Sequence, residues 1–69
     1  MYKVGDEVLF TFLGEEYTGT ISDKIDNNRW KVEGSNGTIY PFIYGKQPIN
    51  NKGSKLETPL GVIIKKIDK

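Results

Sequence analysis

Apolar and polar residues alternate over short segments along most of this chain, and glycine or proline separates the segments. The segments are rich in Val, Ile, Tyr, Phe and Thr, which fit the pleated and half-buried surface of a β-sheet. No window keeps a helical period for long enough to compete with this pattern. The sequence therefore predicts an all-β protein with strands over residues 7–13, 16–25, 29–33, 38–44 and 61–67.

Turn residues lie between the first four of these ranges. Gly14 supplies a tight reversal, residues 26–28 (Asp-Asn-Asn) tolerate the left-handed conformation that a hairpin needs, and residues 34–37 contain an Asn-Gly pair. Three consecutive hairpins make a meander, whose edges stay open unless the sheet curls and closes. Gly19 is a position where the second strand can bend sharply. We therefore expect a small closed barrel.

The stretch from Gly45 to Pro59, GKQPINNKGSKLETP, interrupts the strand pattern with Pro, Gly, Asn and Lys. It predicts a long loop before the last strand, and such loops are often functional or mobile. It is either a flexible connector or an arm that contacts a partner. In the last strand the alternation predicts Val62 and Ile64 on one face, while Lys65 and Lys66 mark an outer or edge position.

The strand period also predicts which side chains form the core. The inward positions, by this period, are Val8, Phe10, Ile21, Val32, Ile39, Val62 and Ile64. Trp30 shares a face with Val32, so it either belongs to the core or lies across an open barrel end. Tyr17 shares a face with Ile21 and points toward the interior or its rim.

The fourth predicted strand carries bulky residues on both faces. Ile39 and Ile43 lie on one face, and Tyr40, Phe42 and Tyr44 lie on the other. Pro41 has no backbone donor and therefore indicates an edge or a bulge. We expect the three aromatic residues to form an outward strip, either exposed or covered by the 45–59 loop.

Composition narrows the possible chemistry. A chain of 69 residues holds one domain, which buries only about 60% of the surface of its unfolded chain. It contains no Cys and no His, which excludes disulfides, thiol nucleophiles, thiolate or imidazole metal sites and histidine-based catalysis. We expect no catalytic site, no metal and no cofactor.

The formal charge of +1 indicates neither a strongly basic nor a strongly acidic protein. No apolar run approaches the length of a membrane span, and the first residues lack the apolar centre of a signal peptide. We therefore expect a cytoplasmic protein with no membrane partner. A net charge close to zero also mildly favours self-association.

Short strands in this order resemble the SH3-like small barrels, including the Tudor and KOW domains. The residues that carry the resemblance are VGDEVLFTF, then EEYTGTI, then RWKVEGSNGTIYPF, within residues 4–44. The resemblance implies a five-stranded antiparallel barrel, and the long loop before the last strand departs from the family pattern. The single domain would span residues 1–69, with the meander over 4–44, the loop over 45–59 and the last strand over 60–67.

Tudor domains that bind methylated Lys or Arg hold the cation in an aromatic cage at the barrel mouth. By this resemblance, Phe12, Tyr17 and Tyr40 match cage positions. The family often has a fourth aromatic residue near the position of Gly34 in this chain. Glu15, Glu16 or Glu33 would supply the acidic neighbour.

The leading hypothesis is a non-enzymatic module that recognises a protein or peptide through aromatic residues at the barrel mouth and on strand four. The candidate residues are Phe12, Tyr17, Trp30, Tyr40, Phe42 and Tyr44. The alternative is a nucleic-acid binder that stacks bases on Tyr17, Trp30 and Tyr40. Its phosphate contacts would be Lys46, Lys52, Lys55, Lys65 and Lys66. A third hypothesis is a homodimer that adds strands edge to edge.

The content of Asn, Lys and Ile is typical of an AT-rich bacterial or phage genome. In that setting histone-type ligands are not expected. A small phage or mobile-element protein that binds and modulates a host protein then becomes a further interpretation.

Overall fold

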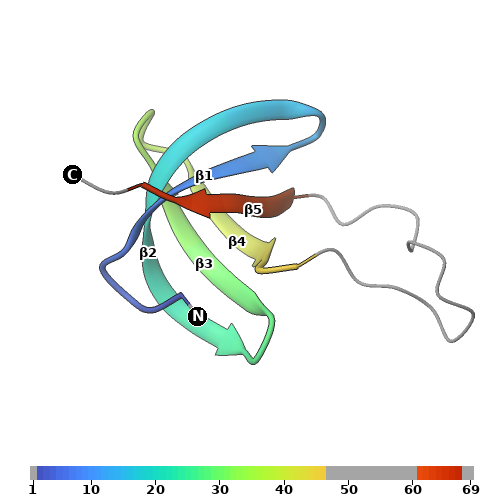
Figure 1. The fold of residues 1–69 in the computed structure, drawn as a ribbon. Helices are drawn as coiled ribbons and strands as arrows, with labels where there is room; N and C mark the ends of the chain where they lie inside the picture. Colours follow the sequence, from blue (N-terminus) through green and yellow to red (C-terminus); the bar gives the residue numbers. More distant parts are fainter. Residues whose placement is uncertain (1, 47–60, 68–69) are drawn as a thin grey trace, which may run out of the picture.

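The computed structural model describes residues 2–46 and 61–67, and its strands form one closed barrel (Figure 1). In chain order the strands are β1 (Glu7–Phe12), β2 (Glu15–Asp26), β3 (Arg29–Gly34), β4 (Ile39–Tyr44) and β5 (Gly61–Lys66). Each predicted strand is present, and every boundary agrees to within one residue. The prediction of an all-β small barrel is confirmed, and the architecture is consistent with an SH3-like fold. The described residues contain no helix that could span a membrane.

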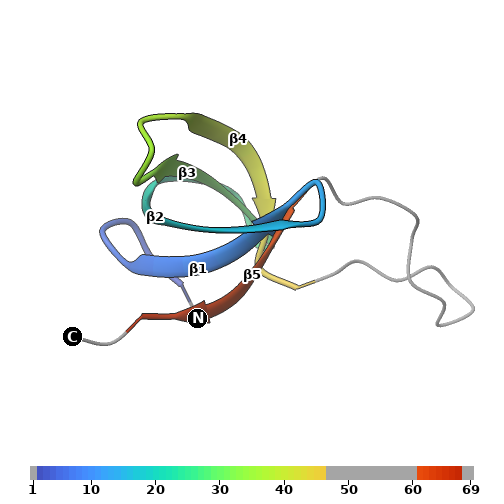
Figure 2. The ribbon, with the colours of Figure 1, turned by 90° about the horizontal axis from the view of Figure 1, so that it is seen from above.

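The strands run around a common interior in the order β1-β2-β3-β4-β5 (Figure 2). Consecutive strands from β1 to β4 pair antiparallel, and β5 returns antiparallel beside β1. The barrel closes through a parallel pairing of β4 with β5, at Tyr44 and Val62. An odd number of strands cannot close a ring with antiparallel neighbours throughout, so one parallel pair is required.

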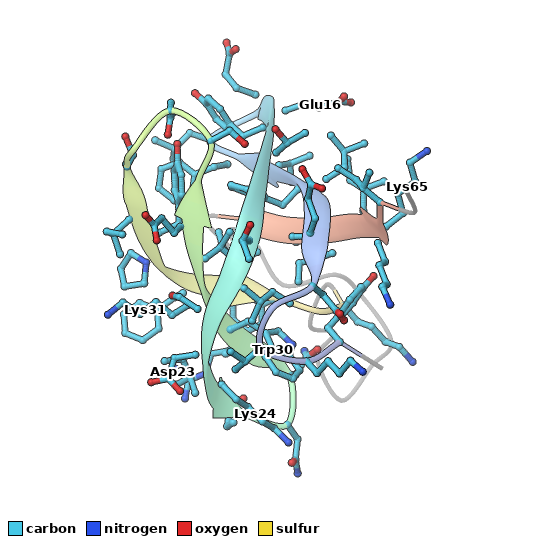
Figure 3. All side chains as sticks on the ribbon, turned by 90° about the vertical axis from the view of Figure 1, so that its left-hand side faces the viewer. Glu16, Asp23, Lys24, Trp30, Lys31 and Lys65 are labelled. Atoms are coloured by element: carbon cyan, nitrogen blue, oxygen red, sulfur yellow. The ribbon has the colours of Figure 1, made fainter. Side chains whose placement is uncertain are left out.

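The two ends of the barrel carry different segments. The β1–β2 and β3–β4 loops lie at one end, and the N-terminal segment, the β2–β3 turn and the end of β4 lie at the other. Figure 3 shows Glu16 near the first end and Trp30 with Lys24 near the second. Each end is therefore built from a separate set of side chains.

The interior is filled by side chains from all five strands. The buried apolar residues are Val8, Phe10, Ile21, Trp30, Val32, Tyr40, Ile43 and Ile63. The core predictions for the first three strands are confirmed, including Trp30 beside Val32. Tyr17 is partly buried and packs against this core, as its face predicted.

The predicted face of the last strand is wrong by one residue. Ile63 is buried, whereas Ile64 is 47% exposed and Val62 is only half-buried. The inward position next to Ile63 is Gly61, where a Cβ would lie 2.5 Å from the Thr11 carbonyl oxygen. Only glycine allows β5 to approach β1 this closely, so the residues of β5 that face the interior are Gly61 and Ile63. Side chains alternate between the two faces of a strand, so a prediction that is shifted by one residue assigns every side chain to the opposite face.

The predicted faces of β4 are also wrong in part. Tyr40, expected outside, is 4% exposed, and Ile39, expected in the core, is 48% exposed. Val32 pairs with Tyr40 and Trp30 pairs with Ile43, so three steps along β4 oppose two steps along β3. The extra residue lies at Pro41 or Phe42 and forms a β-bulge, one of the two features that Pro41 had indicated. It brings Tyr40 and Ile43 to the same inner face.

The turns differ in how they are held. Leu13 (φ 51°) and Gly14 (φ 82°) both have positive φ between the paired residues Phe12 and Glu15, which defines a two-residue type I′ loop. The β2–β3 turn was expected to use left-handed residues, but neither Asn27 nor Asn28 has a positive φ. The Asp26 side chain holds that turn instead, because its Oδ1 accepts the Asn28 backbone N–H at 2.9 Å.

The predicted 45–59 loop lies outside the described residues from position 47 onward, and so do Lys52 and Lys55.

Candidate functional site

Aromatic side chains from three strands meet at the end of the barrel that carries the β1–β2 loop. Tyr40 lies at their centre, with ring centroids 5.0 Å from Phe10, 4.9 Å from Phe12 and 5.7 Å from Tyr17. Phe10 and Tyr17 are directly opposite each other in the β1–β2 register, with centroids 6.0 Å apart. We call Phe12, Leu13, Tyr17 and Tyr40 together the aromatic mouth.

The sequence places Tyr40 at this centre through two neighbours. A Cβ on Gly34 would lie 2.7 Å from Tyr40 Cε2, so the absence of a side chain at Gly34 leaves room for the ring. Asn36, in the β3–β4 loop, donates a hydrogen bond from Nδ2 to the Tyr40 hydroxyl at 3.1 Å. Gly34 thus admits the Tyr40 ring.

The rings of the aromatic mouth touch one another. Their centroid separations are those of ordinary aromatic pairs in tilted or edge-to-face contact. Tyr40 is buried, while Phe12 and Tyr17 are partly buried against the core and keep part of their surface exposed. The geometry is a filled barrel end with an apolar surface.

Leu13 stands out at the tip of the β1–β2 hairpin. It is 68% exposed and has φ 51°, a conformation that costs an L-residue other than glycine about 1–2 kcal/mol. Asn, Asp and Gly are the residues that type I′ loops prefer at this position. A leucine here is unfavourable for the turn and places an apolar side chain in solvent beside Phe12. Strain of this kind is a feature of functional sites.

The outer face of β4 carries a second apolar surface. Ile39 and Phe42 are each 48% exposed, and Pro41 between them is also exposed. The Arg29 guanidinium lies 5.6 Å from the centroid of the Phe42 ring. The predicted strip does not form as expected, since Tyr40 turns inward and Tyr44 is half-buried.

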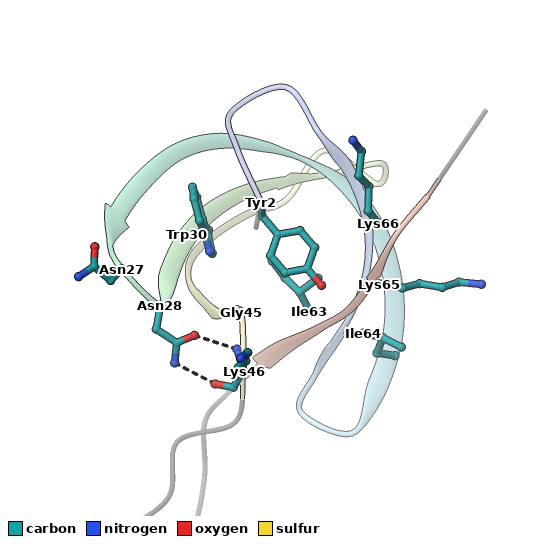
Figure 4. A pocket seen from close by; sticks show the side chains of 10 residues that line it. All are labelled: Tyr2, Asn27, Asn28, Trp30, Gly45, Lys46, Ile63, Ile64, Lys65 and Lys66. Atoms are coloured by element: carbon teal, nitrogen blue, oxygen red, sulfur yellow. Dashed lines mark hydrogen bonds between the residues drawn. The ribbon is translucent and has the colours of Figure 1, made fainter.

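A pocket of about 810 Å³ opens at the opposite end of the barrel (Figure 4). It lies between the N-terminal segment, the β2–β3 turn, the end of β4 and β5. The residues that line it are Tyr2, Asn27, Asn28, Trp30, Gly45, Lys46, Ile63, Ile64, Lys65 and Lys66. Trp30 thus belongs to the core and also forms a wall of this pocket.

Asn28 fixes the rim of this pocket. Its Nδ2 donates to the Lys46 carbonyl at 3.0 Å, and its Oδ1 accepts the Lys46 backbone N–H at 2.9 Å, as the dashed lines in Figure 4 show. The Gly45 backbone N–H donates to the Asn28 carbonyl at 2.9 Å. The β2–β3 turn is thereby joined to the end of β4.

The same turn carries a carboxyl group whose pKa is shifted, that of Asp26. Arg29 Nε donates to Asp26 Oδ2 at 2.6 Å, and this hydrogen bond, together with that from Asn28, holds the pKa of Asp26 below its ordinary value near 3.8. Both side chains are substantially exposed. The pair therefore organises the turn.

Acidic residues are dispersed over the described part of the barrel. No group of three side chains that could hold a metal ion occurs among the residues that the structure describes. The most buried carboxylate there is Asp6, whose Oδ1 lies 3.6 Å from Lys66 Nζ and whose Oδ2 accepts the Lys3 backbone N–H.

Comparisons with protein-family models, with curated proteins and with solved structures found no match to this chain.

The structure brings together Phe12, Tyr17 and Tyr40 at one end, and leaves Trp30 at the other end and Phe42 on the outer face of β4. Sequence reasoning missed Leu13 and Tyr2. Leu13 carried a signal, because a leucine precedes Gly14 where a two-residue hairpin favours Asn or Asp. Tyr2 carried none, since it lies outside every predicted strand.

Proposed function

We propose that this protein is a non-enzymatic binding module that recognises another protein through the aromatic mouth. The observation that carries the proposal is Leu13, an exposed leucine held in a left-handed turn position. The fold gains nothing from that choice, whereas a partner gains an apolar anchor at the tip of a hairpin. A few anchors contribute most of the energy at protein interfaces, and tyrosine, present beside Leu13 as Tyr17, is enriched among them.

Neighbouring side chains extend this anchor into a surface. Phe12 and Tyr17 flank the hairpin tip and keep part of their rings exposed. Ile39 follows the β3–β4 loop at the same end and precedes Tyr40, which touches both rings. A patch of exposed apolar residues rimmed by polar residues such as Glu15 and Glu16 is typical of a protein contact.

The Tudor-like resemblance places its cage at this same end, with the acidic neighbours Glu15 and Glu16 in the adjoining strand. Because Tyr40 fills the space between Phe12 and Tyr17, the geometry favours a flat apolar contact over capture of a single methylated cation. The proposed ligand is therefore an apolar segment of another protein.

A displayed library of random peptides, panned against immobilised protein, tests the proposal. Wild type should enrich apolar or aromatic sequences, and Tyr17→Ala should lose at least about 90% of that binding, a loss of roughly 1.4 kcal/mol or more. Lys31→Ala, on the outward face of β3, is the control and should bind as wild type does.

Thermal unfolding of each variant separates loss of a contact from loss of the fold. Peptides that bind Tyr17→Ala as tightly as wild type, while it remains folded, would contradict the proposed site. Failure to enrich any peptide with the folded wild-type protein would contradict the proposed ligand class.

A further inference from the structure

The pocket at the second end of the barrel has a chemical character of its own. Its described lining includes Lys46, Lys65 and Lys66, and no Asp or Glu. Lys66 is partly neutralised by Asp6 at 3.6 Å, while Lys46 and Lys65 form no ion pair within the described residues. The pocket rim therefore has a net positive charge, in a protein whose total formal charge is only +1.

Trp30 supplies a hydrogen-bond donor at this pocket. The residue as a whole is 3% exposed, and its indole N–H donates no hydrogen bond to any described residue. The nitrogen is not among the buried polar atoms that lack a partner, so it keeps a small exposed surface at the pocket and can donate to a ligand there. The Trp30 nitrogen is near Gly45, where a Cβ would lie 3.4 Å from it, so glycine keeps the approach to the donor open.

Tyr2 supplies an aromatic surface. It is partly buried against the core cluster and lines the pocket together with Ile63. Figure 4 shows Tyr2 and Trp30 as the two rings of the site, one from the N-terminal segment and one from β3. Trp30 is too buried for a base to stack on its face, so stacking at this end falls to Tyr2.

The pocket thus offers an aromatic face, an unpaired N–H donor and a cationic rim, and its volume of about 810 Å³ lies in the range of small-molecule sites. A ligand that fits must have a planar part, hydrogen-bond acceptors and negative charge. A carboxylate alone would leave most of this volume empty, whereas a heteroaromatic base joined to a phosphate uses all three features.

We propose that this end pocket binds a nucleotide, with the base against Tyr2 and an acceptor on the Trp30 N–H. The phosphate lies at the rim beside Lys46, while the Lys66 ammonium lies on the opposite side of the Tyr2 ring and pairs with Asp6. In Figure 4 the Lys65 side chain extends away from the Tyr2 ring, so it contributes long-range attraction more than direct contact. The nucleotide is either free or a unit of a single strand, since both present the same base and phosphate. This site is independent of the aromatic mouth.

The test uses the indole N–H signal of Trp30 in a ¹⁵N-labelled sample, because the chain contains a single tryptophan. The probes are the four ribonucleoside 5′-monophosphates, a ten-nucleotide single-stranded DNA and inorganic phosphate. We expect a saturable shift of the indole signal with a nucleotide or with the oligonucleotide. A response to mononucleotides identifies a free-nucleotide site, and a response to the oligonucleotide alone identifies a single-strand site.

Variants assign the contacts. Lys46→Gln combined with Lys65→Gln should weaken binding about tenfold at low salt, and the salt dependence should become shallower. Tyr2→Leu should weaken it by about tenfold through loss of stacking, and Tyr2→Phe should restore it. Lys31→Gln is the matched control for loss of a surface lysine and should have little effect.

An indole signal that stays in place with every probe, in the folded protein, would overturn the proposal. So would binding that the lysine and Tyr2 variants leave unchanged. A shift produced by inorganic phosphate to the same extent and at the same concentrations would show a general anion site, and would overturn the assignment to a nucleotide.

Discussion

Tyr40 and Leu13 show how single residues decide the character of the first barrel end. Tyr40 turns inward because Gly34 leaves space for its ring and because the bulge at residues 41–42 shifts the faces of β4. Leu13 does the opposite, since it remains in solvent at a turn position that disfavours it. The barrel end is therefore filled from within and apolar on its outside.

The hydrogen bond between Arg29 and Asp26 predicts how a single substitution changes the pKa of Asp26. Arg29→Gln removes the strongest hydrogen bond to the Asp26 carboxylate, so the pKa of Asp26 should rise toward its ordinary value near 3.8. Because the pKa of Asp26 is lower in the folded state, its stabilising contribution is present above the unfolded-state pKa and is lost as the pH falls through the folded-state pKa. The pair is exposed, so the effect on stability should be small.

An NMR titration of the Asp26 carboxyl carbon measures this pKa directly. Lys31→Gln serves as a control for the loss of a positive charge and should leave the pKa of Asp26 close to that of wild type. An unchanged pKa in Arg29→Gln would show that the side-chain hydrogen bond does not act as described.

At the scale of strands, the sequence was sufficient to locate the elements but not all of their faces. Alternation and turn residues predicted all five strands, because each strand is bounded by Gly, Pro, Asn or Asp. The faces of β4 and β5 were wrong in part because a bulge and a close approach at Gly61 depend on the neighbouring strand. Those contacts are non-local, so a local period cannot show them.

The register of β5 can be tested with two adjacent isoleucines. Ile63 is buried and Ile64 is 47% exposed, so Ile63→Val should lower the free energy of unfolding by about 0.5–1.5 kcal/mol. Ile64→Val should change it by no more than about 0.5 kcal/mol. Urea denaturation followed by tryptophan fluorescence measures both. A larger loss in Ile64→Val than in Ile63→Val would show that β5 is paired one residue out of the described register.

For the whole molecule, closure of the barrel separates two ends with different chemistry. One end is apolar and filled, with Leu13 at its tip, and the other is a cationic pocket beside Trp30. Phe12, Tyr17 and Tyr40 were predicted to occupy one mouth from the resemblance, and they do converge there. The pocket could not be predicted, because Tyr2, Asn28 and Lys46 meet only after the N-terminal segment and the β2–β3 turn fold onto the barrel.

The central claim is that the aromatic mouth keeps an unfavourable leucine in order to bind another protein. The most direct test measures the stability of Leu13→Asn and its affinity for a peptide selected by the wild-type protein. Asparagine suits the left-handed position, so the variant should be more stable by about 1 kcal/mol and should bind at least about tenfold more weakly. A variant that gains stability and binds with unchanged affinity would contradict the claim, because Leu13 would then serve neither the fold nor a partner.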